Sequence, residues 1–226
     1  MENSNNKKGK IIVIEGLDGS GKATQTRLLL EKLSETHKVR TLSFPDYESD
    51  GSALVRMYLG GEFGDDPMCV NPYAAASFYA VDRVASYLKD WKHDYEAGTL
   101  FVLDRYSTSN MIYMTTKLQR EEWEGFISWL SEYEFDRLEL PRPDGVIYLD
   151  MPPEVSQKLM TGRYVGDESK KDLHEKNVAF LHACRESALF AAEKLGWNVI
   201  SCAKDSEPLS IEEISAMVYE KAKSFL

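Results

Sequence analysis

Short apolar runs rich in β-branched residues recur along the chain and alternate with longer segments of helical pattern. The runs lie at residues 11–14, 39–44, 99–103, 146–149 and 197–201. We interpret them as strands that are buried on both faces, which is typical of a parallel sheet covered by helices. Apolar residues at near-helical spacing from Leu173 to Leu195 predict a helix that ends before Gly196. The pattern therefore predicts an α/β fold with three layers, α/β/α, and a mainly parallel sheet of about five strands.

The predicted elements follow one another without a linker-like stretch or a repeat of fixed period. We therefore predict a polar N-terminal tail over residues 1–10 and a single domain over residues 11–226. The polar segment from Tyr164 to Lys171 is the best candidate for a mobile loop, and we expect a lid over about residues 163–172.

Composition narrows the class of protein. The 226 residues include 27 Lys and Arg against 37 Asp and Glu, a net charge of -10 that argues against a broad nucleic-acid surface. No apolar run approaches the roughly 18 residues of a membrane span, so we expect no membrane partner. Three widely spaced cysteines without a C-x-x-C pair indicate reduced thiols in a cytoplasmic protein.

A glycine-rich segment lies between the first predicted strand and a helical run. It matches G-x-x-x-x-G-K-[ST] except at the last position, where Ala23 replaces the hydroxyl residue. Glycines let backbone N–H groups turn toward a phosphate, and Lys22 at this spacing can reach the β- and γ-phosphates. We expect water or another side chain to replace the missing Mg²⁺ ligand. The predicted ATP-binding residues of this loop are Gly16, Asp18, Gly19, Ser20, Gly21, Lys22, Ala23 and Thr24.

Five further stretches give the chain a recognisable order of motifs. They are Phe44-Pro45, Tyr79 to Arg83, Asp104 to Tyr106, Ser109 to Tyr113, and Leu140 to Asp144. With the glycine-rich loop they resemble the thymidylate kinases, the P-loop nucleoside monophosphate kinases that phosphorylate dTMP to dTDP. The resemblance implies an ATP-dependent phosphotransferase with a P-loop NTPase fold, Mg²⁺ as cofactor, ATP and dTMP as its small-molecule partners, and a homodimer.

The same resemblance implies an acceptor site. A helix puts Tyr79 and Arg83 on one face, where in the family an aromatic ring stacks on thymine and an arginine contacts the base or the acceptor nucleotide. The family assigns Asp18 to the sugar 3′-hydroxyl, Phe44 to a wall of the site, and Tyr113 to the 2′-deoxyribose preference. The full set of dTMP-binding residues is expected to be Asp18, Phe44, Pro45, Tyr79, Arg83, Arg105, Ser109, Asn110 and Tyr113.

The residues expected to act on the transferring phosphate come from several segments. Arg105 resembles the arginine that grips the acceptor phosphate, and Asp104 beside it is expected to orient Mg²⁺ or its waters. Some relatives carry arginines where this chain has Asp46 and Gly19, so acceptor binding should rest on Arg83 and Arg105. The catalytic residues are expected to be Lys22, Asp104, Arg105 and, from the lid, Arg163, which is also expected to contact ATP. A loop after the fifth strand, around Ala203, is the candidate adenine contact.

Other interpretations of these residues stay open at this stage. Tyr113 is almost as typical of core packing as of a sugar contact. Core packing is the less favoured alternative for Tyr79, as is a surface salt bridge for Arg83, and Asp104 is also compatible with an internal ion pair with Arg105 or Lys22. The chain is also compatible with a kinase for another nucleoside monophosphate, or for a deoxynucleoside with Glu15 or Asp104 as base. A third alternative, suggested by Ala23 and Asp46, is a nucleotide-binding regulator without catalysis.

Overall fold

A parallel sheet forms the centre of the molecule. The computed structural model describes residues 8–64, 66–163 and 178–226. Its main strands are β1 (Ile11–Gly16), β2 (Val39–Ser43), β3 (Leu100–Asp104), β4 (Gly145–Asp150) and β5 (Asn198–Ser201). They form a 5-stranded sheet in the order β2-β3-β1-β4-β5, and every neighbouring pair is parallel. Each strand agrees with a predicted one to within two residues, so the predicted sheet is confirmed.

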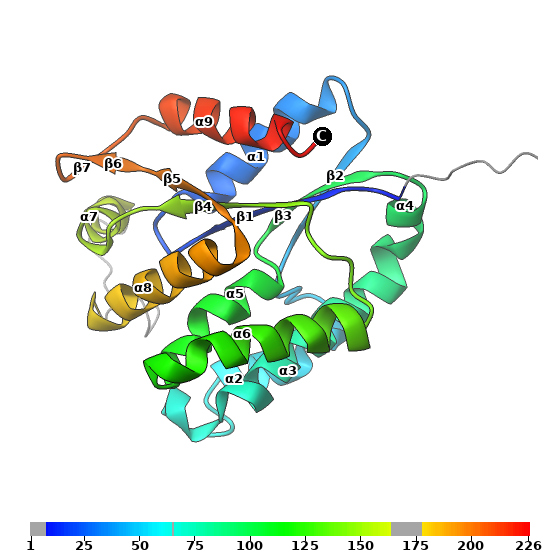
Figure 1. Cartoon of the computed structure of the whole chain (residues 1–226), viewed down its shortest axis with the longest axis vertical. Helices are drawn as coiled ribbons and strands as arrows, with labels where there is room; N and C mark the ends of the chain where they lie inside the picture. Colours follow the sequence, from blue (N-terminus) through cyan, green and yellow to red (C-terminus); the bar gives the residue numbers. More distant parts are fainter. Residues whose placement is uncertain (1–7, 65, 164–177) are drawn as a thin grey trace, which may run out of the picture.

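Helices cover both faces of this sheet. They are α1 (Lys22–Ser34), α2 (Ala53–Leu59), α3 (Pro72–Ser86), α4 (Lys92–Glu96), α5 (Ser107–Tyr113), α6 (Trp123–Ser131), α7 (Pro153–Arg163), α8 (Val178–Leu195) and α9 (Ile211–Lys223). α1 and α9 lie on one face, and α5, α6 and α8 lie on the other with α2 and α3 beyond them (Figure 1). The predicted three-layer architecture is confirmed. α8 ends before Gly196, whose φ of 68° suits a helix C′ position.

Alternate residues of β1 explain why the strand has no polar face. Ile12 and Ile14 pack with Leu29 of α1 and Ile214 of α9. Ile11 and Val13 point to the opposite layer, where they join a cluster around Trp91. All four β1 side chains are fully buried, so the central strand contributes to both halves of the core.

The predicted tail differs from the structure at its end, and the predicted lid lies almost entirely outside the described residues. Gly9 and Lys10, placed in the polar tail, are anchored: Gly9 N donates to the Tyr95 carbonyl at 2.6 Å, and Lys10 Nζ donates to the Phe225 carbonyl at 2.6 Å. The predicted lid lies outside the described residues except for the backbone of Arg163 at the end of α7. In the part of the chain that the structure describes, no helix is long and apolar enough to cross a membrane.

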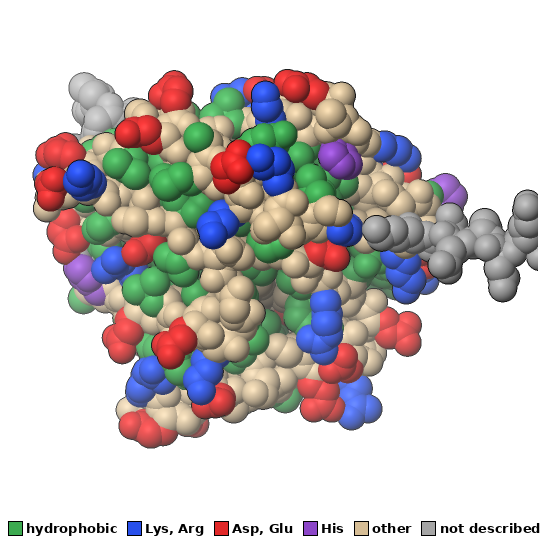
Figure 2. Space-filling view, turned by 45° about the horizontal axis from the view of Figure 1, so that its top comes forward, with side chains coloured by type: hydrophobic (Ala, Val, Ile, Leu, Met, Phe, Trp, Pro, Cys, Tyr) green, Lys and Arg blue, Asp and Glu red, His purple; other side chains and the backbone are tan. Residues whose placement is uncertain are grey.

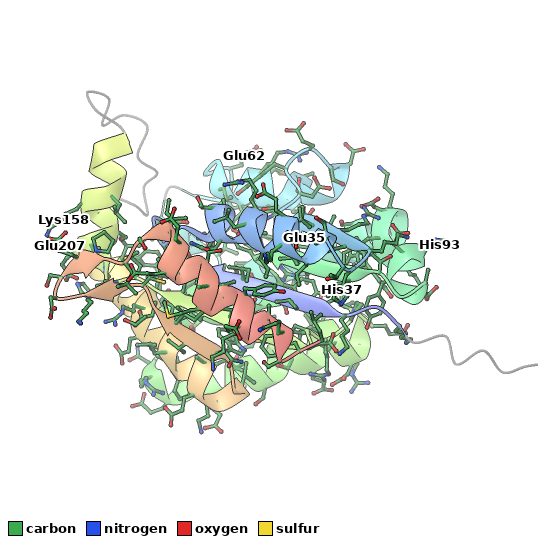
Figure 3. All side chains as sticks on the ribbon, turned by 90° about the horizontal axis from the view of Figure 1, so that it is seen from above. Glu35, His37, Glu62, His93, Lys158 and Glu207 are labelled. Atoms are coloured by element: carbon green, nitrogen blue, oxygen red, sulfur yellow. The ribbon has the colours of Figure 1, made fainter. Side chains whose placement is uncertain are left out.

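The loop predicted around Ala203 is a small antiparallel hairpin. β6 (Ala203–Lys204) pairs with β7 (Glu207–Pro208), directly after β5. Figure 3 shows Lys158 of α7 beside Glu207 of β7, and the Lys158 Nζ to Glu207 Oε1 distance is 3.9 Å. The hairpin and α7 therefore lie together at the edge where the parallel strands end. This is the edge at which open α/β sheets bind their ligands.

Charged side chains of both signs are distributed over the surface. On the face drawn in Figure 2, Asp and Glu side chains are interspersed with Lys and Arg, and apolar side chains lie between them. Many of the basic groups are paired locally, as Arg40 is with Asp90 and Asp94. The face drawn in Figure 2 therefore shows no continuous acidic patch.

Candidate active site

The glycine-rich loop connects the carboxyl end of β1 to the N-terminus of α1. Gly21 precedes α1 with a φ of 87°, a left-handed conformation that side chains other than glycine rarely adopt. A Cβ on Gly16 would lie 2.5 Å from Ser20 Oγ, so the loop also depends on close approach. The first turn of α1 carries no acidic residue, which leaves the positive end of the helix dipole uncompensated. The loop thus has the form of an anion-binding site.

Lys22 lies inside this loop rather than in solvent. Its Nζ donates to the Leu17 carbonyl at 3.0 Å and lies 3.6 Å from Asp18 Oδ1. Burial, reinforced by the positive charge of Arg105, lowers the pKa of Lys22 to about 8. The carboxylates of Asp18, Asp104 and Glu15 favour the charged form of Lys22 but do not offset its burial, so the phosphates of a bound polyanion would stabilise the ammonium.

Arg105 connects the loop to the acceptor side of the site. It follows β3 with a φ of 67°, a strained conformation for a residue with a side chain. Its Nη2 lies 2.5 Å from Asp18 Oδ1, and its Nη1 donates to the Tyr113 hydroxyl at 3.1 Å. The ion pair between Asp104 and Arg105, which was the alternative interpretation of Asp104, is not among the contacts of the described residues, where Arg105 pairs with Asp18. Arg105 thus lies between the phosphate loop and the residues predicted for dTMP.

Asp104 is the last residue of β3, next to the strand that leads into the glycine-rich loop. Its Oδ1 is buried and has no hydrogen-bond partner among the described residues. No group of three or more His, Cys, Asp or Glu that could hold a metal ion occurs within those residues. This donor set fits a Mg²⁺ ion held largely by phosphates and water with one carboxylate, and does not fit a metal cage built by the protein alone.

A cavity of about 510 Å³ opens beside Asp18 and Arg105. All nine residues predicted for dTMP line it: Asp18, Phe44, Pro45, Tyr79, Arg83, Arg105, Ser109, Asn110 and Tyr113. Asp18 lies in the loop after β1, Phe44 and Pro45 follow β2, and Arg105 follows β3. The others lie on α3 and α5. Tyr79 and Arg83 share a face of α3 as predicted. Tyr113 and Tyr79 therefore face a cavity and are not simply core residues.

Sequence reasoning missed part of the cavity wall. These residues are Tyr47, Tyr58, Leu59, Asp66, Met68, Tyr106, Met114, Thr116, Lys117 and Phe180. Many lie in the irregular segment between β2 and α3, where no periodic pattern marks a wall. Lys117 Nζ donates to the Tyr58 hydroxyl at 2.6 Å and to the Val70 carbonyl at 3.1 Å, so this side of the cavity is fixed by α2 and the turn after α5.

Arg83 is not the surface residue that one interpretation allowed. Its side chain is buried and forms a bidentate ion pair with Glu134 at 2.8 and 2.5 Å. Its charge is therefore compensated within the protein, and the expectation that it shares the acceptor phosphate with Arg105 is weakened. Glu134 had no signal in the sequence, because it lies 51 residues from its partner in a charged stretch of ordinary appearance.

Buried Glu15 binds half-buried Ser109, which lines the cavity. Glu15 Oε1 accepts hydrogen bonds from the Ser109 and Thr108 hydroxyls, each at 2.7 Å. Glu15 is fully buried and does not line the cavity, so it is badly placed for the base role that a deoxynucleoside kinase would need. The network instead fixes the start of α5 against β1.

The remaining predicted residues lie around the glycine-rich loop. Ser20 Oγ is buried without a partner among the described residues, Ala23 is exposed at the start of α1, and Thr24 is half-buried. Gly19 has a φ of 79°. Ala203 lies in β6, at the ligand edge but away from the cavity wall. The side chain of Arg163 lies outside the described residues.

Comparison with known proteins places this geometry in a family. The model of the thymidylate kinase family matches residues 14–214, which include the glycine-rich loop and all nine acceptor residues. The thymidylate kinase of Mycobacterium tuberculosis H37Rv is 32% identical over 198 residues, covering 83% of this chain and 87% of that protein. A probable thymidylate kinase of Thermococcus onnurineus is 33% identical over 218 residues, covering 94% of this chain and 98% of that protein.

Solved structures agree at the level of the fold. The thymidylate kinase of Candida albicans superimposes with a TM-score of 0.68 over 96% of this chain and 92% of that chain, at 21% identity. The family match spans residues 14–214, and these residues include every residue that lines the cavity. The structural match covers nearly the whole chain. The chain therefore belongs to the thymidylate kinase family of phosphotransferases.

Proposed function

We propose that this enzyme transfers the γ-phosphoryl group of ATP to dTMP, giving ADP and dTDP, with the cavity as its acceptor site. The observation that carries the proposal is that the cavity adjoins the phosphate loop through Asp18 and Arg105. Donor and acceptor phosphates would then meet between Lys22 and Arg105. Two sites that share a wall satisfy the main requirement of phosphoryl transfer, which is alignment of the two reactants.

The donor site is assigned to the glycine-rich loop. Backbone N–H groups of the loop and the N-terminus of α1 bind the phosphates of ATP, and Lys22 contacts its β- and γ-oxygens. We assign the adenine to the edge near Ala203 of the β6-β7 hairpin, and we assign to Arg163 a contact with the transferring phosphate. Asp104 is the residue that would hold Mg²⁺, directly or through water, and the ion would supply neutralisation of charge on the phosphate oxygens.

The acceptor site is assigned to the cavity. Arg105 binds the dTMP phosphate, Tyr79 and Phe44 form apolar walls, and Tyr113 lies against the sugar. The second pKa of a phosphate monoester is about 6, so the attacking oxygen is already ionised at neutral pH and needs no general base. This oxygen forms a bond to the γ-phosphorus of ATP, the bond from that phosphorus to the β,γ-bridging oxygen breaks, and ADP leaves with the electron pair.

Transfer of label tests this assignment. With ATP labelled at the γ-phosphate, Mg²⁺ and dTMP, labelled dTDP should form in an equimolar ratio to ADP. ADP without labelled dTDP would indicate hydrolysis rather than transfer. Binding of ATP without either product would favour the regulator alternative.

The affinity for ATP should fall as the pH rises through about 8. In the ligand-free site burial lowers the pKa of Lys22 to about 8, whereas bound phosphates favour its charged form. Below this pH Lys22 is already protonated; above it, binding must take up a proton. We therefore expect the Kd for ATP to rise by up to about tenfold per pH unit above 8. Titration calorimetry at pH 8.5 in two buffers of different ionisation enthalpy should show proton uptake, and a flat affinity between pH 7 and 9 would contradict the assignment.

We also propose that the enzyme is a homodimer that associates through α2 and α3. Val81 of α3 is 45% exposed, and Leu88, in the π-helical turn Tyr87–Trp91 that continues α3, is 63% exposed. Leu54 of α2, a helix that packs against α3, is exposed as well. Leu88→Asp should convert a dimer into a monomer of 25.7 kDa in sedimentation velocity, because a buried carboxylate at this contact would be unpaired. Ile211→Asp, an equally apolar exposed position on α9, is the matched control and should leave the dimer intact. A monomeric wild-type enzyme would contradict the proposal.

We place this activity in the cytoplasm. The three cysteines, Cys69, Cys184 and Cys202, are free thiols in the structure, and burial raises the pKa of Cys202 to about 12. Free thiols, two of them buried, are typical of proteins from a reducing compartment.

A further inference from the structure

A carboxylate behind the cavity wall connects two residues that line it. Glu134 lies in the π-helical turn Glu132–Arg137 that follows α6, and its side chain is fully buried. Its two oxygens accept from Arg83 Nε at 2.8 Å and from Arg83 Nη2 at 2.5 Å. Its Oε1 also accepts from Asn110 Nδ2 at 3.4 Å. One carboxylate therefore binds a residue of α3 and a residue of α5 at the same time.

These contacts determine which groups Arg83 offers to the cavity. A guanidinium is planar and carries five N–H donors in a fixed fork, so a bidentate partner fixes the plane of the whole group. The remaining N–H groups are on Nη1 and Nη2, and Nη1 has only a long contact of 3.5 Å with the Tyr106 carbonyl. Arg83 can therefore offer hydrogen-bond donors to a bound base, and it has no acceptor to offer.

Asn110 is held so that it offers a hydrogen-bond acceptor to the cavity, whereas Arg83 offers donors. Its Nδ2 donates to the Ala76 carbonyl at 3.1 Å as well as to Glu134. The amide orientation follows from these two acceptors, since the reverse orientation would set the amide oxygen against two other oxygens. The group that Asn110 can present to a base is consequently its Oδ1, a hydrogen-bond acceptor.

A donor beside an acceptor matches only some bases. Thymine and uracil carry a carbonyl oxygen at C4, which accepts, next to an N3–H group, which donates. Cytosine carries the reverse pattern, an amino group at C4 that donates and an unprotonated N3 that accepts. With Arg83 and Asn110 in these orientations, the C4 amino group of cytosine would face an N–H donor of Arg83, and its N3 would face the Oδ1 acceptor of Asn110. Neither contact is a hydrogen bond, so buried polar groups would be left unpaired.

We propose that Glu134 is the positioning residue that sets base selectivity, because it fixes the donor of Arg83 and the acceptor of Asn110 together. The inference rests on the proposed function, since it concerns the base of the same acceptor. Glu134 does not touch the substrate; it acts through the two residues that do. A purely structural ion pair is the competing explanation, yet buried pairs are commonly no more stabilising than apolar residues of similar volume.

The variant Glu134→Gln tests the proposal directly. A glutamine offers one oxygen and one NH₂ group, so it cannot accept from Arg83 at both oxygens, and its NH₂ repels a donor of Arg83 or Asn110. We expect KM for dTMP to rise about tenfold or more, with kcat changed by less than about threefold and KM for ATP unchanged. The ratio of kcat/KM for dTMP to that for dCMP should fall about tenfold. Glu132→Gln, in the same turn but exposed and paired with Arg137, is the matched control and should leave all these constants unchanged.

A second variant separates selectivity from folding. The double variant Arg83→Met, Glu134→Leu replaces the ion pair with apolar side chains of similar volume, and thermal unfolding followed by circular dichroism reports whether it folds. The proposal predicts a folded protein with raised KM for dTMP and little discrimination against dCMP.

The proposal would be overturned if the folded double variant kept the wild-type KM for dTMP and the wild-type selectivity. It would also be overturned if Glu134→Gln kept both and changed only the melting temperature. Either result would mean that the Arg83–Glu134 ion pair has a structural role only. A wild-type enzyme that turns over dCMP as well as dTMP would overturn it as well. The absence of any dTMP turnover by the wild-type enzyme would instead contradict the proposed function itself.

Discussion

Replacement of Lys22 with methionine is expected to lower kcat for phosphoryl transfer about 10³-fold. Methionine has a similar volume but carries no charge, so the β- and γ-oxygens of ATP would lose the buried ammonium of Lys22. The measurement is the steady-state rate of ADP formation with saturating ATP and dTMP. Lys32→Met, an exposed lysine in the last turn of the same helix, is the matched control and should retain wild-type kcat.

The stability of the same variant provides an independent check. Because burial lowers the pKa of Lys22 below its ordinary value of 10.5, the charged form is disfavoured in the folded protein. Removing the charge should therefore leave the melting temperature at pH 7 equal to or above that of the wild type. A large loss of kcat with retained stability supports a catalytic role, whereas unchanged kcat would remove Lys22 from the mechanism.

Replacement of Arg105 with methionine is expected to lower kcat/KM for dTMP about 10³-fold. Arg105 is the arginine that lies between the glycine-rich loop and the cavity, and a bidentate guanidinium contributes both to binding and to alignment of the acceptor phosphate. Arg105→Lys, which keeps the charge but loses the fork, should have an intermediate effect. The measurement is the dependence of initial rate on dTMP concentration for each variant.

Thymidine supplies the control for Arg105. It has the same base and sugar as dTMP but no phosphate, so its inhibition constant should change far less than kcat/KM for dTMP in Arg105→Met. A small change is expected because Arg105 also contacts Asp18 and Tyr113. An equal loss of affinity for thymidine would mean that the substitution disturbs the whole cavity. Arg142→Met, an exposed arginine paired with Asp136 away from the cavity, should behave as the wild type.

Local pattern was sufficient for the parts of the molecule in which neighbouring residues determine the outcome. The apolar runs predicted every strand of the main sheet, and the central strands β1, β3 and β4 are buried on both faces as expected. The edge strands β2 and β5 are partly exposed, so the prediction that every strand is buried was wrong for them. The glycine spacing also predicted the loop around Lys22, since close approach and left-handed backbone demand glycine at Gly16 and Gly21.

Local sequence patterns could not predict contacts between residues that lie far apart in the sequence. Family resemblance, rather than spacing, brought Tyr79, Asn110 and Phe44 together before the structure did. The pairing of Arg83 with Glu134 and the left-handed backbone of Arg105 depend on how α3, α5 and α6 pack, and no local signal marks them. The β6-β7 hairpin was missed because each of its strands spans only two residues, too short to show a period.

The central claim is that the cavity beside the phosphate loop selects dTMP as the acceptor, and initial rates with a panel of acceptors test it most directly. ADP release coupled to NADH oxidation would be followed with ATP, Mg²⁺ and, in turn, dTMP, dUMP, UMP, CMP, dGMP and thymidine. The account predicts the highest kcat/KM for dTMP, lower values for dUMP and UMP, and turnover near background for CMP, dGMP and thymidine. Preferential turnover of thymidine would assign the enzyme to the nucleoside kinases, and equal turnover of CMP and dTMP would contradict the assignment of the base to Arg83 and Asn110.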